Sequence, residues 1–186
     1  MTPAQPTLAV FASEQGPGDA ERASIMSQAG AYLARRGARL VCLAEGDEFP
    51  TPLVTAARAA GGTVTLVADG DFVPPPAIVA PVERHDDVDL RLDRVAELAD
   101  VLIGLPGSLH SGSRLYQVWT RGGAAGRLPV VVLNRNRAFE ILRGFAADVL
   151  SHSVKRHDRG IQFADSVEDL WNKTVWILGE AEAARR

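Results

Sequence analysis

Short apolar runs alternate with amphipathic segments along the whole chain, and this alternation limits the folds available to it. The runs are nearly continuous in apolar residues, which is typical of strands buried on both faces of a parallel sheet. The amphipathic segments between them are typical of helices that cover those faces. The predicted strands are residues 8–12, 39–43, 63–67, 101–105, 130–133 and 161–163. The sequence therefore predicts an α/β fold, a doubly wound parallel sheet.

Several predicted helices carry recognisable end signals. Asp19 is placed to begin the first helix, and Gly37 follows it at the position favoured for a helix end. Asp86 or Asp87 is expected to cap a helix that runs to Leu98, and residues 166–169 resemble a capping box. A further helix is expected to place a row of apolar residues on one face: Phe139, Leu142, Phe145 and Val149. The proline run at 74–76 predicts a loop.

Composition restricts the class of protein. At 186 residues and 46% hydrophobic residues, we expect one domain over 1–186, with 1–6 and 180–186 as frayed ends. A net charge of −3 supplies no basic field for nucleic acid or an anionic membrane. Cys42 is the single cysteine, which excludes an intramolecular disulfide and fits the cytoplasm. The N-terminus lacks a signal-peptide pattern, and no apolar run approaches ~20 residues.

The segment 105–113 is a loop of small residues, Leu-Pro-Gly-Ser-Leu-His-Ser-Gly-Ser, placed between a strand and a helical-looking segment at 114–119. Free backbone N–H groups and the positive end of a helix dipole meet at such a junction, and together they suit a phosphate. The hydroxyls of Ser111 and Ser113 are expected to add hydrogen bonds or to cap the helix. The alternative is a capping turn without a ligand.

The carboxyl ends of the other strands complete the predicted site. In open α/β sheets, ligands bind outside these ends, where the strand order reverses. The loops that begin at Ser13, Ala44 and Asn134 lie at such ends, together with the loop at 105–113. These loops are the expected rim of a binding site.

The chain resembles the LOG-like Rossmann proteins, which are often mislabelled as lysine decarboxylases, within the SLOG superfamily. The resemblance covers residues 7–178 in order. It rests on the segment Ala56-Ala-Arg-Ala-Ala-Gly-Gly62, on Ala99-Asp-Val-Leu-Ile-Gly-Leu-Pro-Gly107 and on Pro129-Val-Val-Val-Leu-Asn134. It implies a Rossmann-like SLOG fold and a homodimer. Active LOG enzymes are phosphoribohydrolases that cleave the N-glycosidic bond of nucleoside 5′-monophosphates.

The signature of the active enzymes, PGGxGTxxE, is altered in this chain. In the same register Ser108 and His110 replace glycines, Ser111 replaces the threonine, and Arg114 stands at the glutamate position. The upstream arginine of the family is matched by Arg91. Loss of a base from ribose develops positive charge that a carboxylate stabilises, whereas an arginine repels it. The resemblance therefore implies ligand binding more strongly than it implies turnover.

A second resemblance concerns the loop alone. Gly107-Ser-Leu-His-Ser-Gly-Ser113 is similar to the GLRSGS loop of DNA-processing protein A, another SLOG member. The acidic composition argues against single-stranded DNA as the ligand, so we interpret the loop as a phosphate-binding device.

These observations predict one group of site residues. Arg91 is the candidate catalytic residue; its alternative is a solvated arginine on a polar helix. The candidate phosphate- or ligand-binding residues are Gly107, Ser108, His110, Ser111, Gly112, Ser113, Arg114, Ser13 and Glu45. His110 is either an acid–base group or simply polar, and Arg114 either contacts an anion or lies in solvent. We expect no metal and no cofactor.

The predicted function is the binding of a nucleotide or a related phosphorylated small molecule. One alternative is an active phosphoribohydrolase whose carboxylate comes from Glu14 or Glu45. Another is a sensor or scaffold that uses the old pocket for protein contact.

Overall fold

The computed structural model describes residues 5–13, 19–46, 48–123, 127–150, 152 and 160–183. Strands and helices alternate along most of the chain, as the apolar pattern predicts. The strands are β1 (Thr7–Phe11), β2 (Arg39–Ala44), β3 (Thr63–Ala68), β4 (Val82–Arg84), β5 (Val101–Gly104), β6 (Val130–Leu133) and β7 (Ile161–Ala164). The α-helices are α1 (Asp19–Arg35), α2 (Thr51–Ala59), α3 (Val88–Leu98), α4 (Leu109–Arg121), α5 (Glu140–Phe145) and α7 (Val167–Ala183). A 3-10 turn, η1 (Arg135–Arg137), and a π turn, η2 (Ala146–Leu150), flank α5.

The strands form one seven-stranded sheet in the order β4-β3-β2-β1-β5-β6-β7, and every pair is parallel. Val10 of β1 lies in register with Cys42 of β2 on one side and with Ile103 of β5 on the other. The chain winds outward from β1 to β4 and then returns to β5, so the strand order reverses between β1 and β5. This is the topological switch point of a Rossmann-like fold, and it confirms the predicted fold class.

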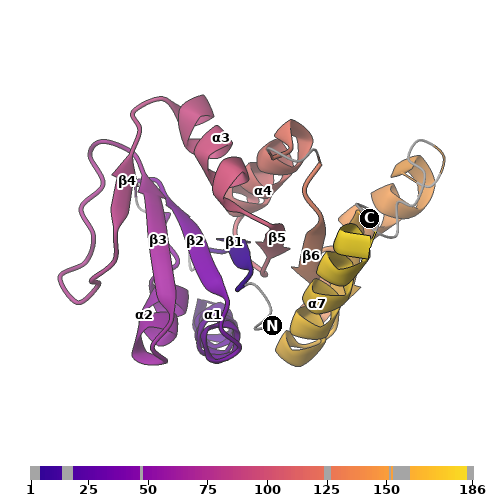
Figure 1. The fold of residues 1–186 in the computed structure, drawn as a ribbon, viewed down its shortest axis with the longest axis horizontal. Helices are drawn as coiled ribbons and strands as arrows, with labels where there is room; N and C mark the ends of the chain where they lie inside the picture. The colour runs from indigo at the N-terminus through magenta and orange to yellow at the C-terminus, as the bar shows by residue number, and fades with distance from the viewer. Residues whose placement is uncertain are drawn as a thin grey trace.

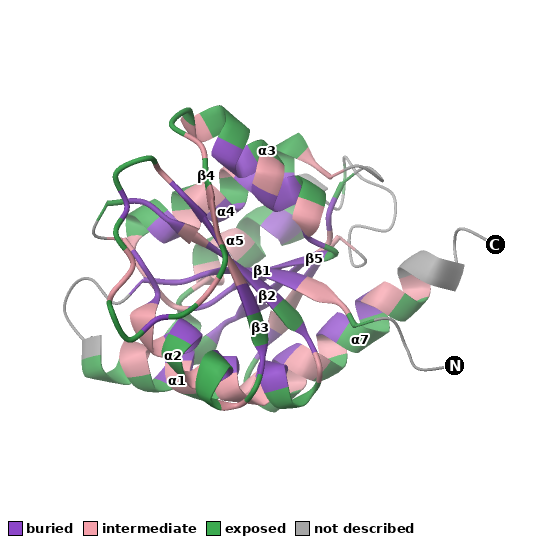
Figure 2. Cartoon of the chain, turned by 60° about the vertical axis from the view of Figure 1, so that its left-hand side comes forward, coloured by how far each residue is buried: buried purple, intermediate pink, exposed green. Residues whose placement is uncertain are grey.

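Helices cover both faces of the sheet. Helices α1, α2 and α7 lie on one face, and α3 and α4 lie on the other (Figure 1). Each face has its own apolar core: Leu40 and Ile103 point toward α1, α2 and α7, whereas Val41 and Leu102 point toward α3 and α4. The strands are buried along most of their length, and the helices show buried residues on one side and exposed residues on the other (Figure 2).

Most predicted helix ends are confirmed. Helix α1 begins at Asp19, and Gly37, just after its end, has a φ of 84°, a conformation that glycine adopts without strain. Asp87 caps α3, because its carboxylate accepts hydrogen bonds from the next helix residues. The hydroxyl of Ser166 accepts a hydrogen bond from the N–H of Asp169 at the start of α7.

Three predictions differ from the structure. Strand β4 was not expected, because Val82-Glu-Arg84 is short and carries two charges; its pairing with β3 defines it. Helix α4 begins at Leu109 instead of near Arg114. The predicted row at 139–149 is wrong as one helix, because the chain divides there into η1, α5 and η2. Positive φ angles at Asn136 and Arg137 precede that break.

Within the described residues, no helix is both long enough and apolar enough to cross a membrane.

Candidate functional site

The loop between β5 and α4 lies at the switch point, as the sequence predicts. Gly107 is the tightest position in it: a Cβ atom added there would lie 2.5 Å from the hydroxyl of Ser111 and 3.0 Å from the backbone nitrogen of Ser13. Ser13 follows β1 and is buried. The loop therefore packs directly on the end of β1, which only a glycine at position 107 permits.

Helix α4 has a complete capping box at its N-terminus. The hydroxyl of Ser108 accepts a hydrogen bond from the N–H of Ser111 at 3.1 Å, and the hydroxyl of Ser111 accepts one from the N–H of Ser108 at 3.0 Å. This reciprocal pair satisfies two backbone donors and starts the helix at Leu109. Ser108 and Ser111 therefore stabilise the helix end. Ser113 lies exposed beyond the first turn and lines neither cavity described below.

The first two backbone N–H groups of α4 belong to Leu109 and His110. Among the described residues neither has a hydrogen-bond partner. Unpaired N–H groups at a helix N-terminus carry partial positive charge and suit an anion. The structure thus retains the backbone donors of the predicted phosphate site, at the first turn of the helix.

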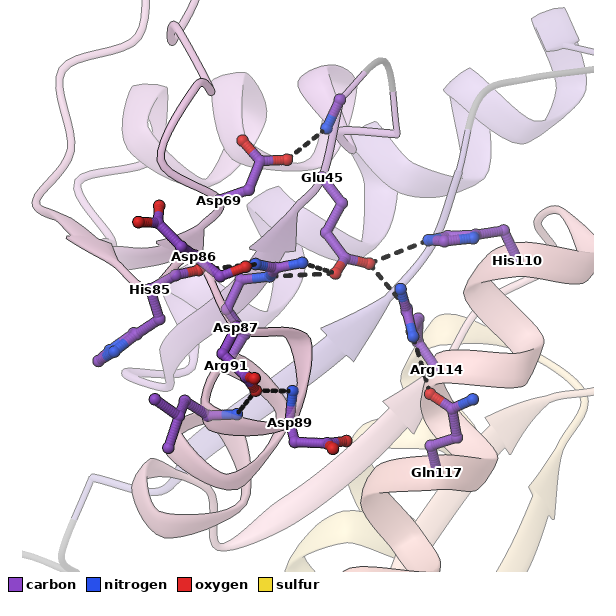
Figure 3. A network of polar contacts seen from close by, with 12 residues as sticks. Glu45, Asp69, His85, Asp86, Asp87, Asp89, Arg91, His110, Arg114 and Gln117 are labelled. Atoms are coloured by element: carbon purple, nitrogen blue, oxygen red, sulfur yellow. Dashed lines mark hydrogen bonds and ion pairs between the residues drawn. The ribbon is translucent and has the colours of Figure 1, made fainter.

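A charged cluster lies beside this turn, with Glu45 at its centre (Figure 3). Oε1 of Glu45 accepts hydrogen bonds from Nε and Nη2 of Arg91, at 3.1 and 2.8 Å. Oε2 accepts one from Nε of Arg114 at 2.7 Å and lies 3.0 Å from Nε2 of His110. The side chains of Glu45 and Arg91 are each only 8% exposed. Four predicted site residues from β2, α3 and α4 therefore meet at one carboxylate.

Arg91 donates hydrogen bonds both to the carboxylate of Glu45 and to the backbone. Its Nη1 donates to the backbone carbonyls of His85 and Asp86, at 2.6 and 2.8 Å, in addition to its two bonds to Glu45. Arg91 is therefore a buried, hydrogen-bonded side chain and not a solvated arginine on a polar helix, and its catalytic role stays a prediction. Arg114 is less enclosed, with 20% of its side chain exposed, and its Nη1 donates to Gln117.

The pKa of Glu45 is lowered from its ordinary value of 4.5. Burial alone would raise the pKa, but hydrogen bonds from Arg91, His110 and Arg114 outweigh that effect. Glu45 is therefore ionised at neutral pH. A carboxylate offers about four lone-pair positions, and the contacts to Arg91, Arg114 and His110 occupy them.

A second carboxylate joins the loop after β2 to the same helix end. Oε2 of Glu48 accepts a hydrogen bond from the hydroxyl of Ser108 at 3.2 Å. Backbone hydrogen bonds in both directions between Glu45 and Glu48 close the loop on itself. The loop after β2 therefore contacts α4 through both of its described glutamates.

On the other side of the first turn of α4 lies an apolar cavity of about 710 Å³, between α4 and α5. It is lined by residues 105–109, Ser111 and Gly112 of the loop and first turn, and by Arg22 of α1. The other lining side chains are aromatic and aliphatic: Leu115, Tyr116, Trp119, Val130, Ala138, Phe139, Ile141, Leu142 and Phe145. Leu109 and Ile141 are each 92% exposed at this cavity. By contrast, the space enclosed next to Glu45 and Arg114 is only about 20 Å³.

The sequence identified the polar half of this region better than the apolar half. Arg91, Glu45, His110 and Arg114 come together, and Gly112 lines the cavity. Glu14 lies outside the described residues. The aromatic wall was missed, because α4 and α5 are adjacent only in the fold. Glu48 was missed although it follows the same strand as Glu45, a position that pointed to the same rim.

No protein-family model matches this sequence, and neither does any curated protein sequence. Solved structures with the same fold include the molybdenum cofactor carrier protein of Chlamydomonas reinhardtii, with a TM-score of 0.66, 15% identity and coverage of 94% of this chain and 99% of that one. The molybdenum cofactor binding protein of the phototrophic bacterium Rippkaea orientalis gives a TM-score of 0.66 at 15% identity, with 95% and 99% covered. The X-ray structure of TM1055 gives 0.62 at 19% identity, with 95% and 99% covered. At such identities the likeness is one of fold, along nearly the whole chain.

Among the described residues, no group of His, Cys, Asp and Glu has the arrangement of a metal site.

Proposed function

We propose that this protein is a divergent LOG-like member of the SLOG superfamily that binds a phosphorylated small molecule, a nucleotide or a related ring compound. The phosphate lies at the N-terminus of α4, against the backbone N–H groups of Leu109 and His110. Arg22 of α1 lines the cavity, and Arg114 of α4, with 20% of its side chain exposed, lies just beyond the first turn of the helix. The ring lies in the cavity between α4 and α5.

One observation carries the proposal: the apolar cavity ends at the helix turn whose N–H groups are unpaired. Its volume of about 710 Å³ falls within the ~300–1,000 Å³ usual for small-molecule sites. Such sites are mostly apolar, with a few polar groups that fix orientation, and here the helix N-terminus supplies those groups. Tyr116, Trp119 and Phe139 offer aromatic surface for a flat ring.

The solved structures of the same fold support this class of ligand. Two of them are described as binding or carrying the molybdenum cofactor. A nucleotide and the molybdenum cofactor share a ring system and a phosphate group, so both belong in a binding screen.

We assign binding without turnover. Arg114 occupies the position of the catalytic glutamate in the LOG signature, and the carboxylate nearest to it, Glu45, has its lone pairs occupied by contacts with Arg91, Arg114 and His110. The space beside Glu45 holds no more than about one water molecule. The alternative, a phosphoribohydrolase that uses Glu45, predicts release of ribose 5-phosphate from nucleoside monophosphates. We expect no release from folded protein.

The test is a thermal-shift and calorimetric screen of nucleoside phosphates and the molybdenum cofactor. A ligand at 100 times its dissociation constant stabilises the folded state by about 2.7 kcal/mol. Gly112→Leu places a side chain at the cavity, where a Cβ meets no atom within 4 Å. We expect this variant to fold and to lose at least about 1.4 kcal/mol of binding free energy, a factor of ten.

Gly179→Leu is the matched control for that variant. Gly179 also lies within a helix, α7, with no atom within 4 Å of an added Cβ, but it is not part of the cavity. Both variants gain helix propensity, about 0.5–1 kcal/mol. Equal binding by the two variants, or no shift with any compound in the screen, would contradict the proposed site.

The exposed apolar side chains around the cavity favour a second role for this face, as the contact surface of a homodimer. Leu109 and Ile141 are almost fully exposed, and Tyr116 and Phe145 are partly exposed beside them. Contiguous apolar surface of this kind marks an interaction site. Sedimentation velocity of wild type and Ile141→Asp distinguishes the cases: a dimer that becomes a monomer supports the interface, and a monomeric wild type removes it.

A further inference from the structure

The two oxygens of Glu45 serve different partners. Oε1 is held by Arg91 within the interior. Oε2 faces Arg114 and His110, whose side chains are 20% and 41% exposed. Figure 3 shows the two groups on opposite sides of the carboxylate. One half of the cluster is therefore enclosed, and the other half opens toward α4.

The enclosed half of the cluster also makes more hydrogen bonds than the open half. Arg91 donates four hydrogen bonds, two of them to backbone carbonyls that fix its position. Arg114 donates one to Glu45 and one to Gln117, and its Nη2 has no hydrogen-bond partner among the described residues. If one contact of Glu45 is to be exchanged, the contact with Arg114 and His110 costs less to break.

The open half borders the proposed phosphate position. His110 contributes a backbone N–H to the unpaired donors of the first turn of α4, while its imidazole contacts Glu45. Arg114 follows one turn later on the same helix. The backbone donors and the two side chains therefore lie on adjacent turns of one helix, and all of them attract an anion.

We infer that Oε2 of Glu45 is an internal stand-in for the ligand phosphate. Without the ligand it neutralises Arg114 and contacts the imidazole of His110. When the phosphate binds, these two side chains exchange Glu45 for the phosphate, while Oε1 remains on Arg91. Glu45 thus keeps the empty site from holding uncompensated cations, and it competes with the ligand. This inference rests on the proposed function.

The test is Glu45→Gln, which keeps the shape and an acceptor oxygen but removes the charge. Two quantities are measured, the free energy of unfolding and the dissociation constant for AMP and for inorganic phosphate. We expect stability to fall, since Arg91 and Arg114 lose their counter-ion. Anion affinity is expected to rise about fivefold, the value of one partly exposed ion pair. Opposite signs identify a competitor, because a purely structural glutamate would lower both quantities.

Two controls locate the effect. Glu83→Gln removes the same charge from another glutamate–arginine pair, in which Arg94 donates to Glu83 and neither residue lines a cavity. We expect less than a twofold change in affinity there. In the double variant Glu45→Gln with Arg114→Gln, the gain is expected to disappear, because the released guanidinium is gone.

The outcomes separate this inference from the proposed function. If wild type and Glu45→Gln bind an anion equally, or if Glu45→Gln binds more weakly, the inferred competition between Glu45 and the phosphate is contradicted. The proposed binding function is unaffected by that result. If neither protein binds AMP, inorganic phosphate or any compound of the screen, the proposed function fails and the inference fails with it. Should Glu45→Gln not fold, Glu45→Asp keeps the charge but, with a side chain shorter by one methylene, weakens the contact with Arg114. We expect this variant, too, to bind the anion more tightly than wild type.

Discussion

The two sides of the first turn of α4 differ in how far their side chains are paired with one another. On the side of β2, Glu45, Arg91, His110 and Arg114 pair with one another around a space of about 20 Å³. On the side of α5, apolar side chains surround about 710 Å³, and Leu109 and Ile141 are exposed. The charged side is closed by ion pairs among its own residues, whereas the other side is an open, mostly apolar cavity with Arg22 at its lining.

This difference separates two roles, stability and ligand selectivity, which the sequence pattern did not distinguish. The arginines of the signature region stabilise the fold and the helix position, because Arg91 is buried and bonded to backbone. The cavity, in contrast, combines core side chains such as Leu115 with the exposed apolar side chains of Leu109 and Ile141. Ligand selectivity is therefore expected to come from the cavity and the helix N-terminus, and stability from the charged cluster.

The largest expected effect on stability is that of Glu45→Ala. Removing one partner of a buried ion pair leaves the other charges uncompensated, which costs about 3–5 kcal/mol. Urea unfolding followed by circular dichroism measures it. Glu48→Ala, on the same loop but half-buried and without an ion pair among the described residues, is expected to cost about 1 kcal/mol or less. Equal losses would mean that the cluster is no more than a surface network.

Acidification tests the same cluster without truncating it. The pKa of Glu45 is lowered in the folded state, so its contribution to stability is complete above its ordinary value of 4.5 and is lost as pH falls through the lowered pKa. The difference in free energy of unfolding between wild type and Glu45→Gln should therefore be constant at neutral pH and shrink below 4.5. A difference that stays constant to the lowest pH at which the protein folds would contradict this.

On the apolar side, the loss of stability caused by a substitution depends on whether the side chain belongs to the core. Leu115 is buried in the core between the sheet and α4, so Leu115→Ala is expected to cost about 2–3 kcal/mol, the lower part of the usual range. Ile141→Ala, at the exposed edge of the same cavity, is expected to change stability by less than about 0.5 kcal/mol. Thermal and urea unfolding of both variants at low protein concentration provide the comparison. A large loss for Ile141→Ala would show that the cavity wall belongs to the folding core.

The smallest expected effect concerns the helix cap between the two sides. Ser108→Ala removes the capping hydroxyl and is expected to cost about 1 kcal/mol. Ser113→Ala, in the same helix and outside the capping box, should stay within about 0.5 kcal/mol. If Ser113→Ala is the more damaging variant, then the helix begins where the sequence pattern alone placed it.

Much of the fold was predictable because its signals are local. Apolar runs mark the buried strands, Gly37 marks a helix end through its positive φ, and Asp87 marks a helix start through hydrogen bonds to its near neighbours. Strand β4 was not predictable in this way, since only pairing with β3 makes Val82–Arg84 a strand. The early start of α4 was missed because Ser108 and Ser111 read equally well as a loop until their reciprocal hydrogen bonds are known.

The sequence singled out residues of the candidate site, but it did not show how these residues contact one another. The sequence alone placed the loop at 105–113 at the carboxyl end of a strand, and the resemblance matched Arg91 and Arg114 to positions of the family signature. Only the tertiary structure decided that Glu45 neutralises both arginines and that a cavity lies between α4 and α5. The physical reason is that ion pairing and cavity shape depend on side chains from β2, α3, α4 and α5, which no sequence spacing brings together. Burial then turns the arginines into partners of an internal carboxylate.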